Sequence, residues 1–169
     1  MFRAIPNTAR TALVLFAIAL VTAFSLPVLA ADPHPVVAYS KQGKFEDVRD
    51  DLKLAIESKG LVIDYQSYLN RMLERTGKDV GSTRKLYQNA QAFVFCSASL
   101  SRKMMEADLA NISMCPYTMV VYATAQEPGK VYVTYRRPWR PDGSAASKAS
   151  LKEVETLLDG IARQALGMK

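Results

Sequence analysis

The residues with the clearest chemical potential are two cysteines, Cys96 and Cys115, which have eighteen residues between them. Cys96 ends an apolar run, and Cys115 begins a segment rich in β-branched and aromatic side chains. A helix between them can return the chain so that the two segments become neighbours. The first interpretation is a disulfide, which stabilises a protein by about 3 kcal/mol for a loop of this length. Two buried unpaired thiols and a redox-active pair are the alternatives, although no Cys-x-x-Cys motif is present.

Methionines near these cysteines in sequence raise a second kind of chemistry. Thiolate and thioether groups suit a soft ion such as monovalent copper, and Met104 and Met114 are the candidates to join Cys96 and Cys115. Zinc fits less well, because a structural zinc site needs four Cys or His ligands and the chain has two Cys and one His. Methionine also commonly fills gaps in a core. We therefore predict no cofactor and keep a soft-metal or haem-type site as the alternative.

A basic segment supplies the third candidate site. We expect this segment to contact an anion or a partner, with the indole ring of Trp139 as a stacking surface. Its members are Arg136, Arg137, Trp139 and Arg140. A solvated linker with the indole packed on the domain is the simpler interpretation, and docking on acidic lipid headgroups is a further one. Phosphate-loop, nucleophile-elbow and His-Glu-x-x-His motifs are absent from the sequence, so we predict no catalytic residues and expect a protein that is not an enzyme.

Residues 1–30 have the organisation of a secretory signal peptide. Two arginines precede an uncharged, mostly apolar run over 11–26, and small residues favour cleavage after Ala30 or Ala31. The apolar run is short for a membrane span of roughly 20 residues, so an uncleaved anchor is the weaker interpretation. We expect a periplasmic or secreted protein, in a compartment where disulfides form and persist.

The rest of the chain has the size and charge of one mildly basic domain. Removing residues 1–30 from the 169 leaves 139 residues and takes away two arginines and no acids, so the net charge falls from +6 to +4. Nucleic-acid-binding proteins usually show a denser basic face, so we expect no nucleic acid partner. The expected partner is an unidentified exported protein or a small ligand.

Hydrophobic periodicity predicts interspersed strands and helices. Strands are expected over 36–40, 61–65, 90–96, 117–124 and 131–135. Helices are expected over 45–56, 97–108 and 151–166, with a shorter one over 70–76 capped by Asn70. This order favours an α+β fold: a single domain with an antiparallel or mixed sheet, helices packed on one face, and a C-terminal amphipathic helix.

Residues 43–138 resemble the domain-of-unknown-function family 302. The resemblance rests on the order of five features: a helix ending at Lys59-Gly60, the run Phe93-Val94-Phe95-Cys96-Ser97, a helix over 101–108, Pro116 ahead of a strand over 119–122, and a closing strand over 131–135. It implies a small α+β domain, often a homodimer, with no established activity. Some relatives are exported and lie near sulfur-oxidation genes, which links the family weakly to sulfur metabolism.

The chain departs from this family in one position. Many relatives carry their second cysteine just after the proline, where this chain has Tyr117. We further expect residues 31–42 to form a lead and first strand, 139–147 a linker, and 148–169 a helix added to the common core. The leading hypothesis is an exported binding or accessory protein with a Cys96–Cys115 disulfide, and the alternative is a small redox, soft-metal or haem-type protein.

Overall fold

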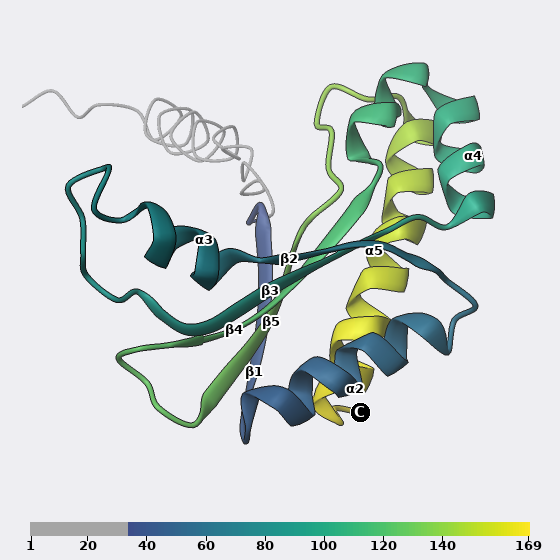
Figure 1. Ribbon diagram of the computed structural model, residues 1–169. Coiled ribbons are helices and arrows are strands. Elements are labelled where there is room, and N and C mark those ends of the chain that lie inside the picture. Colours follow the sequence, from purple (N-terminus) through teal and green to yellow (C-terminus); the bar gives the residue numbers. More distant parts are fainter. Residues whose placement is uncertain (1–33) are drawn as a thin grey trace, which may run out of the picture. The chain divides into compact units, whose positions relative to one another are not determined.

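Five antiparallel strands form one sheet in the computed structural model, which describes residues 34–169 (Figure 1). The strands are β1 (Val36–Gln42), β2 (Ile63–Tyr68), β3 (Tyr87–Phe95), β4 (Tyr117–Thr124) and β5 (Lys130–Arg136). Their spatial order is β1-β5-β4-β3-β2, so β1 and β2 are the edge strands, and the pairing of β2 with β3 shifts register between Ile63 and Tyr65. The expected signal peptide over 1–30 lies outside the described residues.

Two long helices cover one face of the sheet. These are α2 (Phe45–Glu57) and α5 (Ala145–Leu166), which pack against each other, and α4 (Ala98–Ala107) packs against α5. A 3₁₀ helix, η1 (Leu109–Met114), follows α4, and the short α3 (Leu69–Thr76) contacts β3 away from the other helices (Figure 1). Within residues 34–169, no helix combines the length and apolar character that crossing a membrane requires. The predicted α+β class, with one sheet and helices packed on it, is confirmed.

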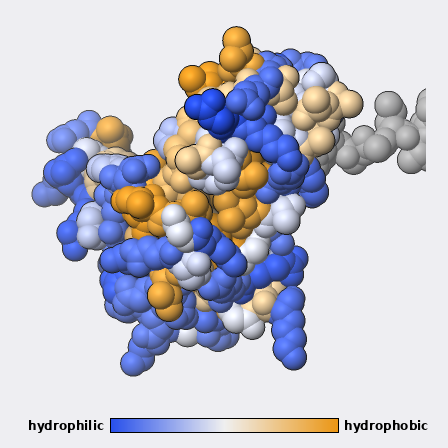
Figure 2. All heavy atoms as spheres, turned by 90° about the vertical axis from the view of Figure 1, so that its right-hand side faces the viewer, coloured by the Kyte–Doolittle hydropathy of each residue, from blue (hydrophilic) through white to orange (hydrophobic). Residues whose placement is uncertain are grey.

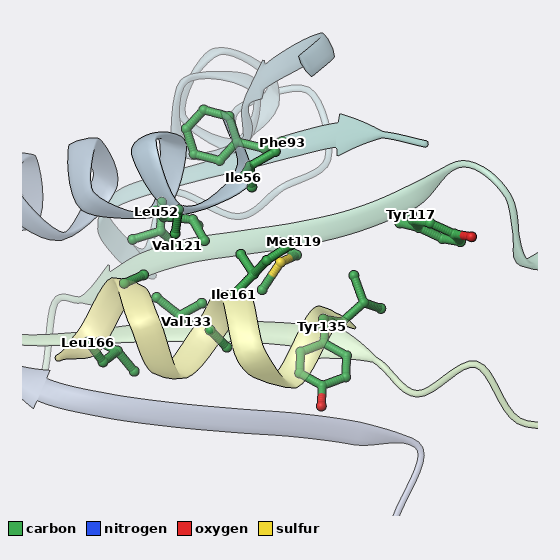
Figure 3. Close-up of a cluster of buried hydrophobic side chains, with 14 of the residues drawn as sticks. Leu52, Ile56, Phe93, Tyr117, Met119, Val121, Val133, Tyr135, Ile161 and Leu166 are labelled. Atoms are coloured by element: carbon green, nitrogen blue, oxygen red, sulfur yellow. The ribbon is translucent and has the colours of Figure 1, made fainter. Parts of the chain in front are cut away.

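The core lies between the sheet and these helices, and the alternation of strand side chains explains it. Tyr117, Met119 and Val121 of β4 all point to the helices and are buried, because successive strand residues face opposite sides. They belong to one buried cluster with Leu52 of α2 and Ile161 of α5, in which Tyr117 lies toward the far end from Leu52 (Figure 3). Each such fully buried aliphatic side chain contributes roughly 1.5–3 kcal/mol relative to exposure.

The outer surface of the helical layer is mostly hydrophilic, with an apolar area at its centre (Figure 2). A shallow hollow of about 440 Å³ lies on this layer, where Leu100 of α4 and Leu157 of α5 are half-buried. On the opposite face of the sheet, the rings of Tyr122 and Tyr132 stack with their centroids 4.9 Å apart. The two faces of the sheet therefore differ, one buried under helices and one bearing tyrosines.

Two local predictions were wrong. Asn70 does not cap α3: Tyr68 stands at the cap position, and the Asn70 side-chain oxygen instead accepts a hydrogen bond from the backbone N–H of Ala90 at 3.3 Å. The C-terminal helix begins at Ala145, inside the expected linker, because the Ser144 hydroxyl accepts a hydrogen bond from the N–H of Ser147 at 3.1 Å.

Two glycines provide a matched test of this packing. Gly160 lies within α5 with open space around it, so Gly160→Ala is expected to stabilise the protein by about 0.5–1 kcal/mol. A Cβ at Gly77 would lie 2.4 Å from the carbonyl oxygen of Ser82, so Gly77→Ala is expected to destabilise it. Urea unfolding of both variants measures the difference, and equal effects would contradict the described packing at Gly77.

Candidate functional site

Cys96 and Cys115 lie side by side at one end of the sheet. Cys96 directly follows β3 and Cys115 directly precedes Pro116 and β4, and the β3–β4 ladder pairs Phe95 with Tyr117. The register therefore brings the two thiols together, with their Sγ atoms 2.7 Å apart. Both side chains are half-buried. A disulfide would require the sulfurs to approach by about 0.7 Å.

A buried polar pair lies directly beneath these sulfurs. The Ser101 hydroxyl, on the first turn of α4, lies 3.5 Å from the Cys115 sulfur and 3.1 Å from the Tyr117 hydroxyl. Ser101 and Tyr117 are both buried, and the Phe95 ring contacts the Tyr117 ring edge-on. The inner side of the cysteine pair is therefore closed by packed side chains.

Burial raises the pKa of the Cys96 thiol to about 11, and the adjacent Cys115 sulfur and the Asp64 carboxylate add to the increase. A neighbouring backbone N–H, that of Tyr117, opposes it only partly. Reactive cysteines in redox enzymes have depressed pKa values that populate the thiolate at neutral pH. The surroundings of Cys96 instead raise its pKa, so little of this thiol is in the thiolate form at neutral pH.

The two predicted methionine ligands have different surroundings. Met104 is fully buried in the core, whereas Met114 is half-buried and lines a pocket described below. Two sulfurs bound tetrahedrally to one ion at about 2.3 Å would be roughly 3.8 Å apart, so metal binding requires Cys96 and Cys115 to separate. Among residues 34–169, no three Cys, His, Asp or Glu side chains are grouped as metal ligands. The soft-metal and haem-type alternatives stay predictions.

A pocket of about 290 Å³ opens beside Cys115, where β4 and β5 diverge. The β4–β5 ladder reaches only as far as the pair Met119 and Tyr135, so the first residues of β4 separate from the segment 136–138. Met114 and Pro116, which flank Cys115 in sequence, line one side of the opening, and Arg136 lines the other. We call this cavity the β4–β5 pocket.

The predicted basic residues separate into different roles. Arg137 donates to the Glu155 carboxylate and to the carbonyl of His34, and Arg140 donates to Asp108 at 2.8 Å. Both arginines therefore stabilise the fold by binding residues of other segments. Trp139 is 38% exposed and outside the β4–β5 pocket. Arg136 lines the pocket, is exposed, and forms no ion pair within residues 34–169.

A polar cluster that the sequence analysis missed joins β1 to α5. Tyr39 donates to Asp159, and Arg163 donates to Asp159 at 2.7 Å and to the Tyr39 hydroxyl at 3.0 Å. Burial alone would raise the pKa of Asp159, but these hydrogen bonds outweigh it and lower the pKa. Its members are far apart in sequence, so no local motif marks them. Because its charges are mutually paired, we assign the cluster to holding β1 against α5.

Comparison with known proteins places these features in a family context. A family model described as "Domain of unknown function DUF302" matches residues 37–165. A crystal structure of an uncharacterized conserved DUF302 protein from Bacillus stearothermophilus is similar in fold, with a TM-score of 0.64 and 15% identity over 79% of this chain and 99% of that one. A search of curated proteins gave no match.

The family match corrects one expectation from the sequence. Similarity was expected over 43–138, with the C-terminal helix as an addition, but the match includes all but the first residue of β1 and all but the last residue of α5. The physical reason is that Val154, Leu158 and Ile161 of α5 are buried in the core. The helix is therefore an integral part of the domain.

The raised pKa of Cys96 gives a testable pH dependence. In the reduced protein at pH 8, Cys96 is expected to react with iodoacetamide on the order of 100-fold more slowly than a thiol of ordinary pKa. Its rate should rise with pH toward about 11, since only the thiolate reacts. Peptide mass spectrometry measures the rate, and rapid alkylation at neutral pH would contradict the described environment.

Proposed function

The chain belongs to the DUF302 family, and within that family we propose that it is an exported, non-enzymatic binding protein that holds a small anion in the β4–β5 pocket. In this proposal a Cys96–Cys115 disulfide fixes the wall of the pocket. The observation that carries the proposal is Arg136, a cation at the pocket that has no ion-pair partner within residues 34–169.

The charge of the pocket supports an anionic ligand. Arg136 and Arg137 both line it, and among the described residues its lining includes no Asp or Glu. Glu155 balances the charge of Arg137 from outside the lining, so the charge of Arg136 stays uncompensated. The hydroxyl of Thr118 is a further hydrogen-bond donor, whereas the Ser113 hydroxyl donates to the carbonyl of Ala110 at 3.0 Å. A volume of about 290 Å³ lies at the lower end for ligand sites, which favours a small molecule.

Three observations support a disulfide as the state of the cysteines. The sulfurs lie 2.7 Å apart, the N-terminal sequence is typical of export to an oxidising compartment, and the raised pKa of Cys96 leaves its thiolate unstabilised. Dithiols with stabilised thiolates are the strong oxidants when paired. Because the Cys96 thiolate is not stabilised, we expect a disulfide that resists reduction. This bond would hold the start of β4 against the end of β3.

A redox-active pair is the second candidate, because the same 2.7 Å separation permits reversible bond formation. The raised pKa of Cys96 weighs against it, since thiol–disulfide exchange proceeds through a thiolate. The reduction potential separates the candidates. A potential below about −300 mV indicates a structural bond, whereas an easily reduced bond would favour redox function.

The disulfide itself is tested by mass and stability. Protein recovered from the periplasm is expected to lack two hydrogens relative to its dithiol mass and to contain no titratable thiol. Cys96→Ser, Cys115→Ser and the double variant should each lose about 2–4 kcal/mol of unfolding free energy, with no additivity, because each removes the same bond. Two free thiols in the recovered protein would refute the proposed disulfide.

The anion site is tested with sulfate as the probe. Arg136→Gln is expected to weaken sulfate binding about tenfold or more, because hydrogen bonds to charged groups contribute about 1.5–3 kcal/mol. Arg102→Gln is the matched control, since Arg102 is an exposed arginine on α4. Isothermal titration at low ionic strength measures both variants. Equal sulfate affinity in both, or no binding by the parent protein, would contradict the proposal.

A further inference from the structure

A second and larger cavity, of about 430 Å³, lies between α3 and the start of β3. Its lining comes from α3, the turn that follows, and the segment 82–87 that leads into β3. We call it the α3–β3 pocket. It shares no lining residue with the β4–β5 pocket, so the two can be tested separately.

We propose that the α3–β3 pocket binds a small organic phosphate monoester. Three cationic side chains line it, Lys78, Arg84 and Lys85, and Glu74 is its one acidic side chain among the described residues. None of these four forms an ion pair within residues 34–169. The lining therefore has a net charge of +2, which matches the charge of about −1.5 to −2 on a phosphate monoester at neutral pH.

The backbone of the same segment offers unused hydrogen-bond donors. Among the described residues, the backbone N–H groups of Thr83, Arg84 and Lys85 donate no hydrogen bond. The hydroxyl groups of Ser82 and Thr83 also line the pocket. Hydrogen bonds from backbone and cationic donors to a phosphate are charge-assisted and stronger than neutral ones. The segment thus combines charge with donors that the fold leaves available.

The shape of the pocket is built into the backbone, and part of its wall is apolar. Ser82 donates its backbone N–H to the carbonyl of Gly77 at 2.8 Å, an approach so close that a Cβ at Gly77 would collide with the Ser82 carbonyl. Leu73 and Tyr87 line the pocket, and the Tyr87 ring packs edge-on against Tyr122 with centroids 5.6 Å apart. These surfaces favour a phosphate that carries an apolar or aromatic group.

Phenyl phosphate is the probe, titrated into protein expressed from the full sequence. Saturable binding is expected, with NMR shifts concentrated at the amides of Thr83, Arg84 and Lys85. The double variant Arg84→Gln/Lys85→Gln should bind at least tenfold more weakly. The control Lys44→Gln/Lys148→Gln removes two positive charges outside the pocket and should bind like the parent, and thermal unfolding of both verifies that they fold. Inorganic phosphate and phenol should each bind more weakly than phenyl phosphate.

Several outcomes would overturn the proposal: no binding of phenyl phosphate, equal binding by the two double variants, or phenol binding as tightly as the phosphate. Binding only to vesicles of phosphatidylcholine with phosphatidic acid would also overturn it, since that result indicates a membrane surface. Arg136→Gln should leave phenyl phosphate binding unchanged while it weakens sulfate binding at the β4–β5 pocket. Failure of one site is therefore distinguishable from failure of the other.

Discussion

The antiparallel ladder between β3 and β4 is the constraint on which the described chemistry depends. It places Phe95 opposite Tyr117, and so the residue after one strand lies beside the residues before the other. Cys96 and Cys115 meet for that reason, and Ser101 closes the space below them from α4. The same ladder directs Phe93 and Met119 to the helices. Core packing and the cysteine pair therefore share one register, and a slip by one residue would destroy both.

The position of α5 determines which arginine is available to a ligand. Neighbouring residues at the end of a strand face opposite sides, so Arg137 points to the helical layer and pairs with Glu155, while Arg136 points away. The cluster of Tyr39, Asp159 and Arg163 holds the same helix against β1. Because Arg137 is paired with Glu155 and Arg136 has no ion-pair partner within residues 34–169, Arg136 is the uncompensated cation at the β4–β5 pocket.

The sequence predicted the fold better than it predicted the sites. The β-branched and aromatic run over 117–124 predicts β4 residue for residue, and the approach of Cys96 to Cys115 followed from expecting adjacent strands. An amphipathic pattern does not show which surface a helix packs against. The sequence therefore led us to expect α5 to be an addition to the common core of the family. Pockets escaped prediction because they form where regularity ends: at the divergence of β4 from β5, and in 77–86, which has no period.

The edge strands have a consequence for how this protein behaves at high concentration. An exposed strand edge is a template for pairing with another chain, and it leads to aggregation when it is long, flat and apolar. Here the register shift between Ile63 and Tyr65 interrupts the regular edge of β2, and the polar residues Ser40, Lys41 and Gln42 occupy the second half of β1. Natural sheets commonly use a bulge or polar residues in an edge strand to prevent that strand from pairing with another sheet. Substitutions that straighten β2 or make β1 uniformly apolar would therefore impair solubility before they impair folding.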